Sequence, residues 1–134
     1  MKFHLLIVDD DKIILMLHKR IVMREELHEN PQSFLSGKDA LDYIKRHNTP
    51  DDLHLVLLDI NMPVMSGWEF LDALEAEELK AAVHVVMVTS STDQSDLQIS
   101  GNYTHVFEFL VKPLAPSSLS QLKTNPLLRQ VYSA

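Results

Sequence analysis

The stretch VLLDINMPVMSG, residues 56–67, decides the fold, because a run of branched aliphatic residues stops at an aspartate, Asp59. The run has the composition of a strand buried on both faces, and the proline and glycine after it mark a turn before a helix. A strand that only had to end could do so in Asn, Ser or Gly. Because this strand ends in a carboxylate, the groups that lie beside Asp59 decide what the chain does.

The same unit, an apolar strand followed by a helical segment, recurs along the chain. Strands are expected at residues 3–8, 32–36, 53–59, 83–89 and 106–111. Strands that alternate with helices favour a parallel sheet with helices on both faces. The sequence therefore predicts an α/β fold, a doubly wound five-stranded parallel sheet, in a single domain over residues 1–134 without an output domain.

Helical segments are expected at residues 11–27 and 38–47, from Gly67 onward, and from about Ser117 or Ser118 to a stop before Pro126. In the first segment Asp11 is a candidate N-cap. The core-facing positions predicted for this helix are Ile14, Leu17, Ile21 and Val22. The polar segment 91–100 can also form a helix.

Composition narrows the functional classes. The net charge of −7 argues against a nucleic-acid-binding surface, which is usually basic. The absence of cysteine excludes disulfides and thiolate metal sites and suits a cytoplasmic protein. No apolar run is long enough to cross a bilayer, so no membrane association is expected. The seven histidines never recur three or four residues apart, which argues against a zinc pair on one helix.

Polar side chains follow four of the five predicted strands, at the point where each strand ends. Asp9 and Asp10 follow the first strand, and Asp59, Thr89 and Lys112 end or follow the third, fourth and fifth. Sites in open α/β sheets form beyond the carboxyl ends of the strands, so these groups are expected to meet at one rim.

Three carboxylates in one pocket repel one another, and a hard divalent cation is the natural way to neutralise them. Mg²⁺ prefers oxygen ligands and leaves room for phosphate oxygens. A carboxylate held beside Mg²⁺, a lysine and a hydroxyl can act as a nucleophile toward phosphorus. The pattern therefore predicts that Asp59 accepts a phosphoryl group and becomes an aspartyl phosphate.

Four motifs, LLIVDDD, LLDINMPVMSGWEF, VVMVTSS and FLVKPL, occur in this order and at strand ends. Through them the chain resembles the receiver domains of two-component response regulators, of the stand-alone kind typified by the chemotaxis receiver. The resemblance runs from about Phe3 to the last helix. It implies a flavodoxin-like sheet with the strand order 2-1-3-4-5, which the resemblance supplies and the spacing alone does not.

The resemblance also implies a role for each residue of the site. Asp59 would be phosphorylated, and Mg²⁺ would be held by Asp9, Asp10, Asp59 and the backbone carbonyl of Asn61. Lys112 would contact the phosphoryl oxygens. Thr89 would move in to hydrogen-bond the phosphoryl group, and the aromatic side chain of Phe109 would move with it. The bond before Pro113 would be cis.

Partners follow from the same resemblance. The donor would be a sensor histidine kinase or a histidine phosphotransfer protein, and the output would be an unknown downstream protein. The chain would be a monomer or a phosphorylation-dependent dimer. It would not be an enzyme toward other molecules, beyond catalysing its own phosphorylation and dephosphorylation.

Simpler interpretations exist for each residue alone. Asp9 and Asp10 could cap a helix or be solvated, Thr89 could be an ordinary strand residue, and Phe109 could belong to the core. Two other functions also stay open. Asp59 could be the nucleophile of a metal-dependent phosphatase, although no second acid or cap is evident, or the chain could be a pseudo-receiver that binds partners without phosphorylation.

Several positions depart from the usual family pattern. Ser66 stands where an acidic residue is frequent before the glycine, and NYTH at 102–105 replaces a usually alanine-rich segment. These changes affect the expected fourth helix and its surface rather than the phosphorylation site.

Overall fold

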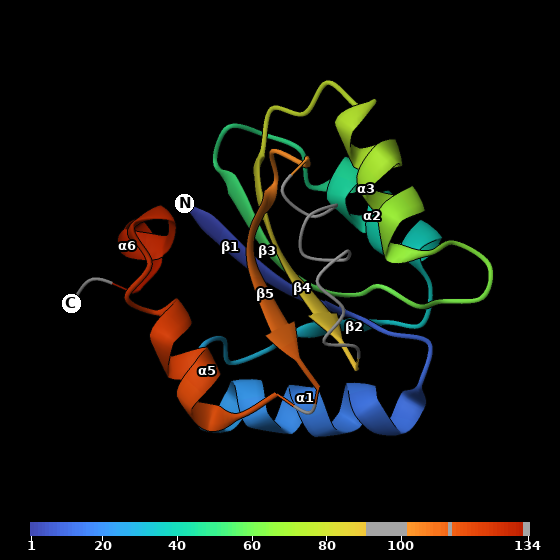
Figure 1. Cartoon of the computed structure of the whole chain (residues 1–134). Helices are drawn as coiled ribbons and strands as arrows, with labels where there is room; N and C mark the ends of the chain where they lie inside the picture. The colour runs from blue at the N-terminus through green and yellow to red at the C-terminus, as the bar shows by residue number, and fades with distance from the viewer. Residues whose placement is uncertain (91–101, 113, 133–134) are drawn as a thin grey trace.

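A five-stranded parallel sheet forms the centre of the molecule in the computed structural model, which describes residues 1–90, 102–112 and 114–132. The strands lie in the order β2-β1-β3-β4-β5 (Figure 1). Their bounds are β1 (Lys2–Val8), β2 (Gln32–Phe34), β3 (Asp52–Asp59), β4 (Ala82–Thr89) and β5 (Val106–Val111). The predicted fold class and strand order are confirmed.

Helices cover both faces of this sheet. The helical elements are α1 (Lys12–Arg24), α2 (Gly37–Arg46), α3 (Gly67–Glu75), α5 (Pro116–Leu122), the 3₁₀ turn η1 (Pro126–Leu128) and α6 (Arg129–Tyr132). In Figure 1, α2 and α3 lie on one side of the sheet, and α1 and α5 lie on the other. The helix expected at 91–100 lies outside the described residues.

The last predicted helix begins earlier than expected, at Pro116 rather than at Ser117 or Ser118. Proline suits the first turn of a helix, because its fixed φ angle is helical and its missing N–H would have no partner there. The predicted helix stops before Pro126, and the chain then folds further, into η1 and α6.

β3 is the central strand, and all eight of its residues are buried. It pairs in parallel with β1 on one side and β4 on the other. Its side chains alternate between two cores, so that Val56 and Leu58 pack on the side of α2 and α3, and Leu55 and Leu57 on the side of α1 and α5. Burial on both faces explains the unbroken aliphatic run that ends at Asp59.

The predicted core-facing positions of α1 are correct at Val22, which is buried, and in part at Ile21, which packs against the core, but wrong at Leu17. The buried residues are Leu15, His18 and Val22, and Leu17 is 38% exposed. The segment is apolar almost all the way round its first turns, so hydrophobic periodicity could not choose between adjacent stripes. His18 belongs to the core, although its polarity argues for the surface.

No helix within the described parts of the chain combines the length and the apolar character that a membrane crossing requires.

Candidate functional site

Three carboxylates and one ammonium group meet at the carboxyl ends of the strands. Oxygens of Asp9, Asp10 and Asp59 lie within 4.8 Å of one another. The Nζ of Lys112 lies 2.6 Å from Oδ2 of Asp9 and 3.1 Å from Oδ1 of Asp59. The structure therefore brings together four of the predicted site residues.

The order of the strands explains why these side chains meet. Asp59 is the last residue of β3, and Asp9 follows β1, which is the neighbouring strand. Lys112 follows β5, which is separated from β3 by β4. The backbone N–H of Lys112 donates to the carbonyl of Thr89 at 2.7 Å, so the chain stays against the end of β4 and the long lysine side chain reaches Asp59.

The residues of the site differ in their exposure to solvent. Asp9, Asp59 and Thr89 are at most 4% exposed, whereas Asp10 is exposed. Thr89 ends β4 next to Asp59, since β4 is the neighbour of β3. A ligand arriving from solvent therefore meets Asp10 first, with the other carboxylates beneath it.

The charges of the site do not balance. Burial and the nearby charge of Asp9 raise the pKa of Asp59, and the contact with Lys112 only partly opposes this rise. Burial alone would lower the pKa of Lys112, but its hydrogen bonds to Asp9 and Asp59 outweigh that cost and raise it. One ammonium group shared between two buried carboxylates leaves net negative charge, so the pocket favours a further cation.

The loop from Ile60 to Gly67 is closed by a hydrogen bond and packs tightly against the backbone of Asp59. The N–H of Gly67 donates to the carbonyl of Ile60 at 2.8 Å. A Cβ added at Gly67 would lie 2.7 Å from the carbonyl oxygen of Asp59 and 2.9 Å from Cα of Ile60. Only glycine lets the start of α3 lie this close to the backbone of Asp59.

The capping role of Ser66 accounts for a serine at a position where the family often has an acidic residue. It caps α3, and it forms a capping box with Glu69 in which each side chain accepts from the other residue's backbone N–H. An acidic residue at this position would also cap a helix. The substitution therefore keeps the local structure of the loop.

Other predicted residues have mixed outcomes. Asp11 caps α1 as expected, and its N–H donates to Oδ1 of Asp9 at 3.0 Å. The N–H of Asn61 donates to Oδ1 of Asp59 over 3.4 Å. Phe109 is partly buried against the core cluster under α2 and α3, which fits the simpler core interpretation and does not test a switching role. Pro113 lies outside the described residues.

The sequence did not indicate the contacts between the segment 102–105 and α3. The hydroxyl of Tyr103 donates to Asp72 at 2.8 Å, and its ring stacks on Trp68 with 5.9 Å between centroids. The N–H of Thr104 donates to Glu75 at 2.9 Å. The unusual NYTH segment thus packs on α3, and no local pattern in the sequence could have indicated a partner thirty residues away.

Comparison with known proteins identifies the family. The model of the response regulator receiver domain matches residues 5–123, and the chain belongs to this family. Receiver domains are signalling modules of two-component systems, and an acidic pocket of the kind formed here is where they generally bind Mg²⁺.

Individual relatives agree with this assignment. A probable methanogenesis regulatory protein, FilR2, from Methanothrix harundinacea is 32% identical over 121 residues, which cover 89% of this chain and 77% of the relative. A chemotaxis protein CheY homolog from Campylobacter jejuni is 26% identical, with 87% and 86% covered. The crystal structure of a two-component response regulator from Cytophaga hutchinsonii superposes with a TM-score of 0.78, at 27% identity and 92% and 96% coverage.

Some relatives are longer than this chain. It spans 45% of the length of a response regulatory protein from Staphylococcus epidermidis. The match there covers less than half of the relative.

Proposed function

We propose that this receiver accepts a phosphoryl group on the carboxylate of Asp59, from a histidine kinase or a histidine phosphotransfer protein in the cytoplasm. The observation that carries the proposal is the shared contact of Lys112 with Asp9 and Asp59, with Asp10 in the same cluster. A purely structural ion pair would not need a third carboxylate, left open to solvent, beside two buried ones.

The donor set fits Mg²⁺, since the ion prefers carboxylate and carbonyl oxygens and uses only a few protein ligands. Asp9, Asp10, Asp59 and the backbone carbonyl of Asn61 would hold it. When bound, Mg²⁺ would neutralise charge on the transferring phosphoryl oxygens. Lys112 provides a second positive charge beside Asp9 and Asp59.

The residues of the chain then have distinct tasks. A carboxylate oxygen of Asp59 forms a bond to phosphorus while the bond from phosphorus to the donor's imidazole nitrogen breaks, and that nitrogen keeps the electron pair. Lys112 moves its ammonium contact from the carboxylate to a phosphoryl oxygen. The hydroxyl of Thr89, at the end of β4, donates to another phosphoryl oxygen.

The signal passes on because phosphorylation adds charge to a pocket that must be balanced again. Recruitment of Thr89 and Lys112 would bias the chain segments around the ends of β4 and β5, with Phe109 following. A downstream protein, or a second copy of this chain, would recognise the changed surface.

The test is phosphorylation by acetyl phosphate, a small donor that needs no kinase. With Mg²⁺, intact mass spectrometry should show one added phosphoryl group, and Asp59→Asn should abolish it. Asp10→Ala or chelation of the metal should slow labelling at least ~10-fold, because charge neutralisation of this kind contributes several kcal/mol to the transition state.

The controls separate this function from its alternatives. Asp51→Asn removes an exposed carboxylate at the other end of β3 and should label normally. Labelling that persists in Asp59→Asn would refute the assignment of the acceptor. Steady hydrolysis of p-nitrophenyl phosphate by a pure preparation would instead support a phosphatase, and a protein that takes no label would be a pseudo-receiver.

A further inference from the structure

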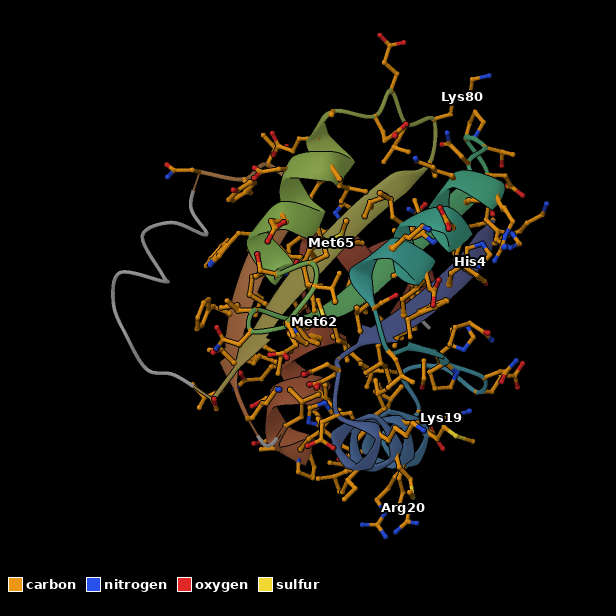
Figure 2. All side chains as sticks on the ribbon, turned by 90° about the vertical axis from the view of Figure 1, so that its right-hand side faces the viewer. His4, Lys19, Arg20, Met62, Met65 and Lys80 are labelled. Atoms are coloured by element: carbon orange, nitrogen blue, oxygen red, sulfur yellow. The ribbon has the colours of Figure 1, made fainter. Side chains whose placement is uncertain are left out.

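A second cluster of metal-binding side chains lies at the opposite ends of the strands. Candidate ligand atoms of His4 on β1, of His47 at the end of α2, and of Asp52 at the start of β3 lie within 4.8 Å of one another. His4 is near the first residue of β1, whereas Asp9 follows the last. Figure 2 shows His4 beside α2 and away from the Met62 and Met65 loop that follows Asp59.

The carboxylate of this cluster is already oriented. Oδ2 of Asp52 accepts two hydrogen bonds from Thr49, one from its N–H at 3.0 Å and one from its hydroxyl at 2.7 Å. Oδ1 lies 2.7 Å from Nε2 of His4. One oxygen is therefore held by the chain while the other is directed at the histidine.

The imidazole of His4 is oriented in the same way. Its Nδ1 lies 2.9 Å from the hydroxyl of Tyr43, so one ring nitrogen is held by α2 while the other points at Asp52. Metal-binding histidines almost always bond an outer partner through the second ring nitrogen, which fixes the tautomer and the ring plane. Tyr43 occupies the place of that partner.

His47 is the third member, and its position is set by the end of α2. Its backbone N–H donates to the carbonyls of Tyr43 and Ile44, and its carbonyl accepts from the ring of His54 at 2.8 Å. Its ring centroid lies 4.9 Å from that of His4. His54 is fully buried, and its ring stacks on that of His4 at 4.5 Å, so it supports the His4 ring as well as the backbone of His47.

We infer that His4, His47 and Asp52 form a binding site for one divalent transition-metal cation, and the donors favour zinc. Two imidazoles and one carboxylate are ligands that zinc accepts, whereas Mg²⁺ prefers oxygen alone. Three protein ligands leave a fourth position for water. The site is independent of the phosphoryl chemistry proposed for Asp59.

The spacing fits such an ion. Zinc bonds of about 2.0–2.1 Å in a tetrahedron place neighbouring ligand atoms roughly 3.3 Å apart. That value lies between the 2.7 Å contact of His4 with Asp52 and the 4.8 Å limit of the whole cluster. Small rotations of the side chains, with no change of the backbone, would bring the three atoms to zinc.

Binding must also balance protons. Nε2 of His4 has to lose its hydrogen to become a ligand, because only the unprotonated nitrogen binds a metal. A neutral ring would carry its hydrogen on Nδ1 and donate it to the oxygen of Tyr43. A doubly protonated ring would release one proton to solvent.

The test is a zinc titration by calorimetry, with Mg²⁺ in excess to occupy the acidic pocket. The chain should bind one zinc ion, and His47→Gln should weaken binding at least ~10-fold. His47 is chosen because its ring makes no hydrogen bond among the described residues and is partly exposed, so the variant should fold. His84→Gln, at a partly buried histidine on β4, is the matched control and should bind zinc normally.

A second readout does not depend on affinity. Zinc should shift the imidazole nitrogen resonances of His4 and His47 in a ¹⁵N spectrum and leave those of His84 in place. It should also raise the melting temperature of the parent chain and not that of His47→Gln, because the ligands join β1, α2 and β3. Equal zinc affinity in the parent and in His47→Gln, or no zinc binding at micromolar concentration, would overturn the inference.

Discussion

Lys112 is the residue on which the electrostatics of the acidic pocket depend. Its ammonium group contacts Asp9 and Asp59 at once, and it cannot neutralise both of them together with Asp10. A buried charge without a partner is costly, so such a cluster is stable only if another cation or a proton supplies the missing charge. Burial, and then the charge of Asp9, raise the pKa of Asp59, so its carboxylate also binds a proton more readily than an isolated one.

At Gly67 the neighbouring backbone of Asp59 and Ile60 leaves no room for a side chain. Gly67→Ala would force its Cβ against the backbone of Asp59 and Ile60, which cannot rotate away. We expect the free energy of unfolding to fall by about 1–3 kcal/mol, as for other overpacked positions. Urea denaturation measures this change, and acetyl phosphate labelling should slow as well because Asp59 moves.

Gly37→Ala is the matched control. There the added Cβ would meet the flexible side chain of Met65 at 3.0 Å, which can move aside. A loss of stability as large as that of Gly67→Ala would contradict the backbone explanation.

The burial of His18 should make the stability of the chain depend on pH. Burial lowers its pKa below the ordinary value of 6.5, and the charge of Asp9 opposes this only in part. A histidine with a lowered folded-state pKa contributes full stability above the unfolded pKa and loses it as the pH falls through the folded pKa. The chain should therefore lose stability as the pH is lowered from 6.5.

His18→Leu should reduce this loss, since leucine does not titrate. Unfolding by urea at about pH 7.5 and about pH 5, with a chelator present, gives the difference in free energy for each protein. The difference should be smaller in the variant. An equal or larger difference would show that other groups control acid stability.

At the scale of secondary-structure elements, α1 ends in an unusual way. Glu26 has a φ angle of 58°, in the left-handed region, and the N–H of Leu27 donates back to the carbonyl of Val22. Helices often end like this, but with glycine at the left-handed position. The side chain of Glu26 therefore adds strain to the connection between α1 and β2.

Glu26→Gly should remove that strain. We expect the free energy of unfolding to rise by about 0.5–1 kcal/mol, because the left-handed conformation costs about 1–2 kcal/mol in a residue with a Cβ and glycine loses some of this gain through the unfolded state. Chemical denaturation checks the change. Glu25→Gly, whose φ is −86°, is the control and should destabilise the chain.

At the scale of the whole molecule, the C-terminal helix connects the two ends of the chain. The hydroxyl of Tyr132 donates to the carbonyl of Leu27 at 2.8 Å, and its ring lies edge-on to Phe3 at 5.7 Å. Burial raises the pKa of Tyr132. In Figure 1, α6 lies beside the N-terminus.

Tyr132→Ala should lower the free energy of unfolding by about 2–4 kcal/mol, because a large, partly buried aromatic group and a hydrogen bond are lost. Tyr132→Phe, which loses only the hydrogen bond, should cost about 1 kcal/mol. Both folded variants should accept phosphoryl groups from acetyl phosphate at the parent rate, since Phe3 lies at the other end of β1 from Asp9. A slower rate would mean that α6 influences the acidic pocket.

The sequence predicted the sheet and the acidic pocket because one rule links them. Parallel strands bring their carboxyl ends to one rim, so Asp9, Asp59 and Lys112 could be placed together without knowing any distance. The strand order needed the family resemblance, because hydrophobic patterns specify strands and not their neighbours.

What could not be predicted depends on contacts between distant segments. The core stripe of α1 was ambiguous because too many of its residues are apolar. The packing of Tyr103 on Trp68 and the meeting of His4, His47 and Asp52 join different elements, and a search for histidines three or four residues apart examines only one helix at a time. Such clusters become visible only when the chain is folded.

The hydrogen bond from Gly67 to Ile60 fixes the length of the connection that it closes. An inserted or deleted residue there would either break this bond or pull the start of α3 away from Asp59. Across related genes, the number of codons between Asp59 and Gly67 should therefore stay constant while the residues they encode vary.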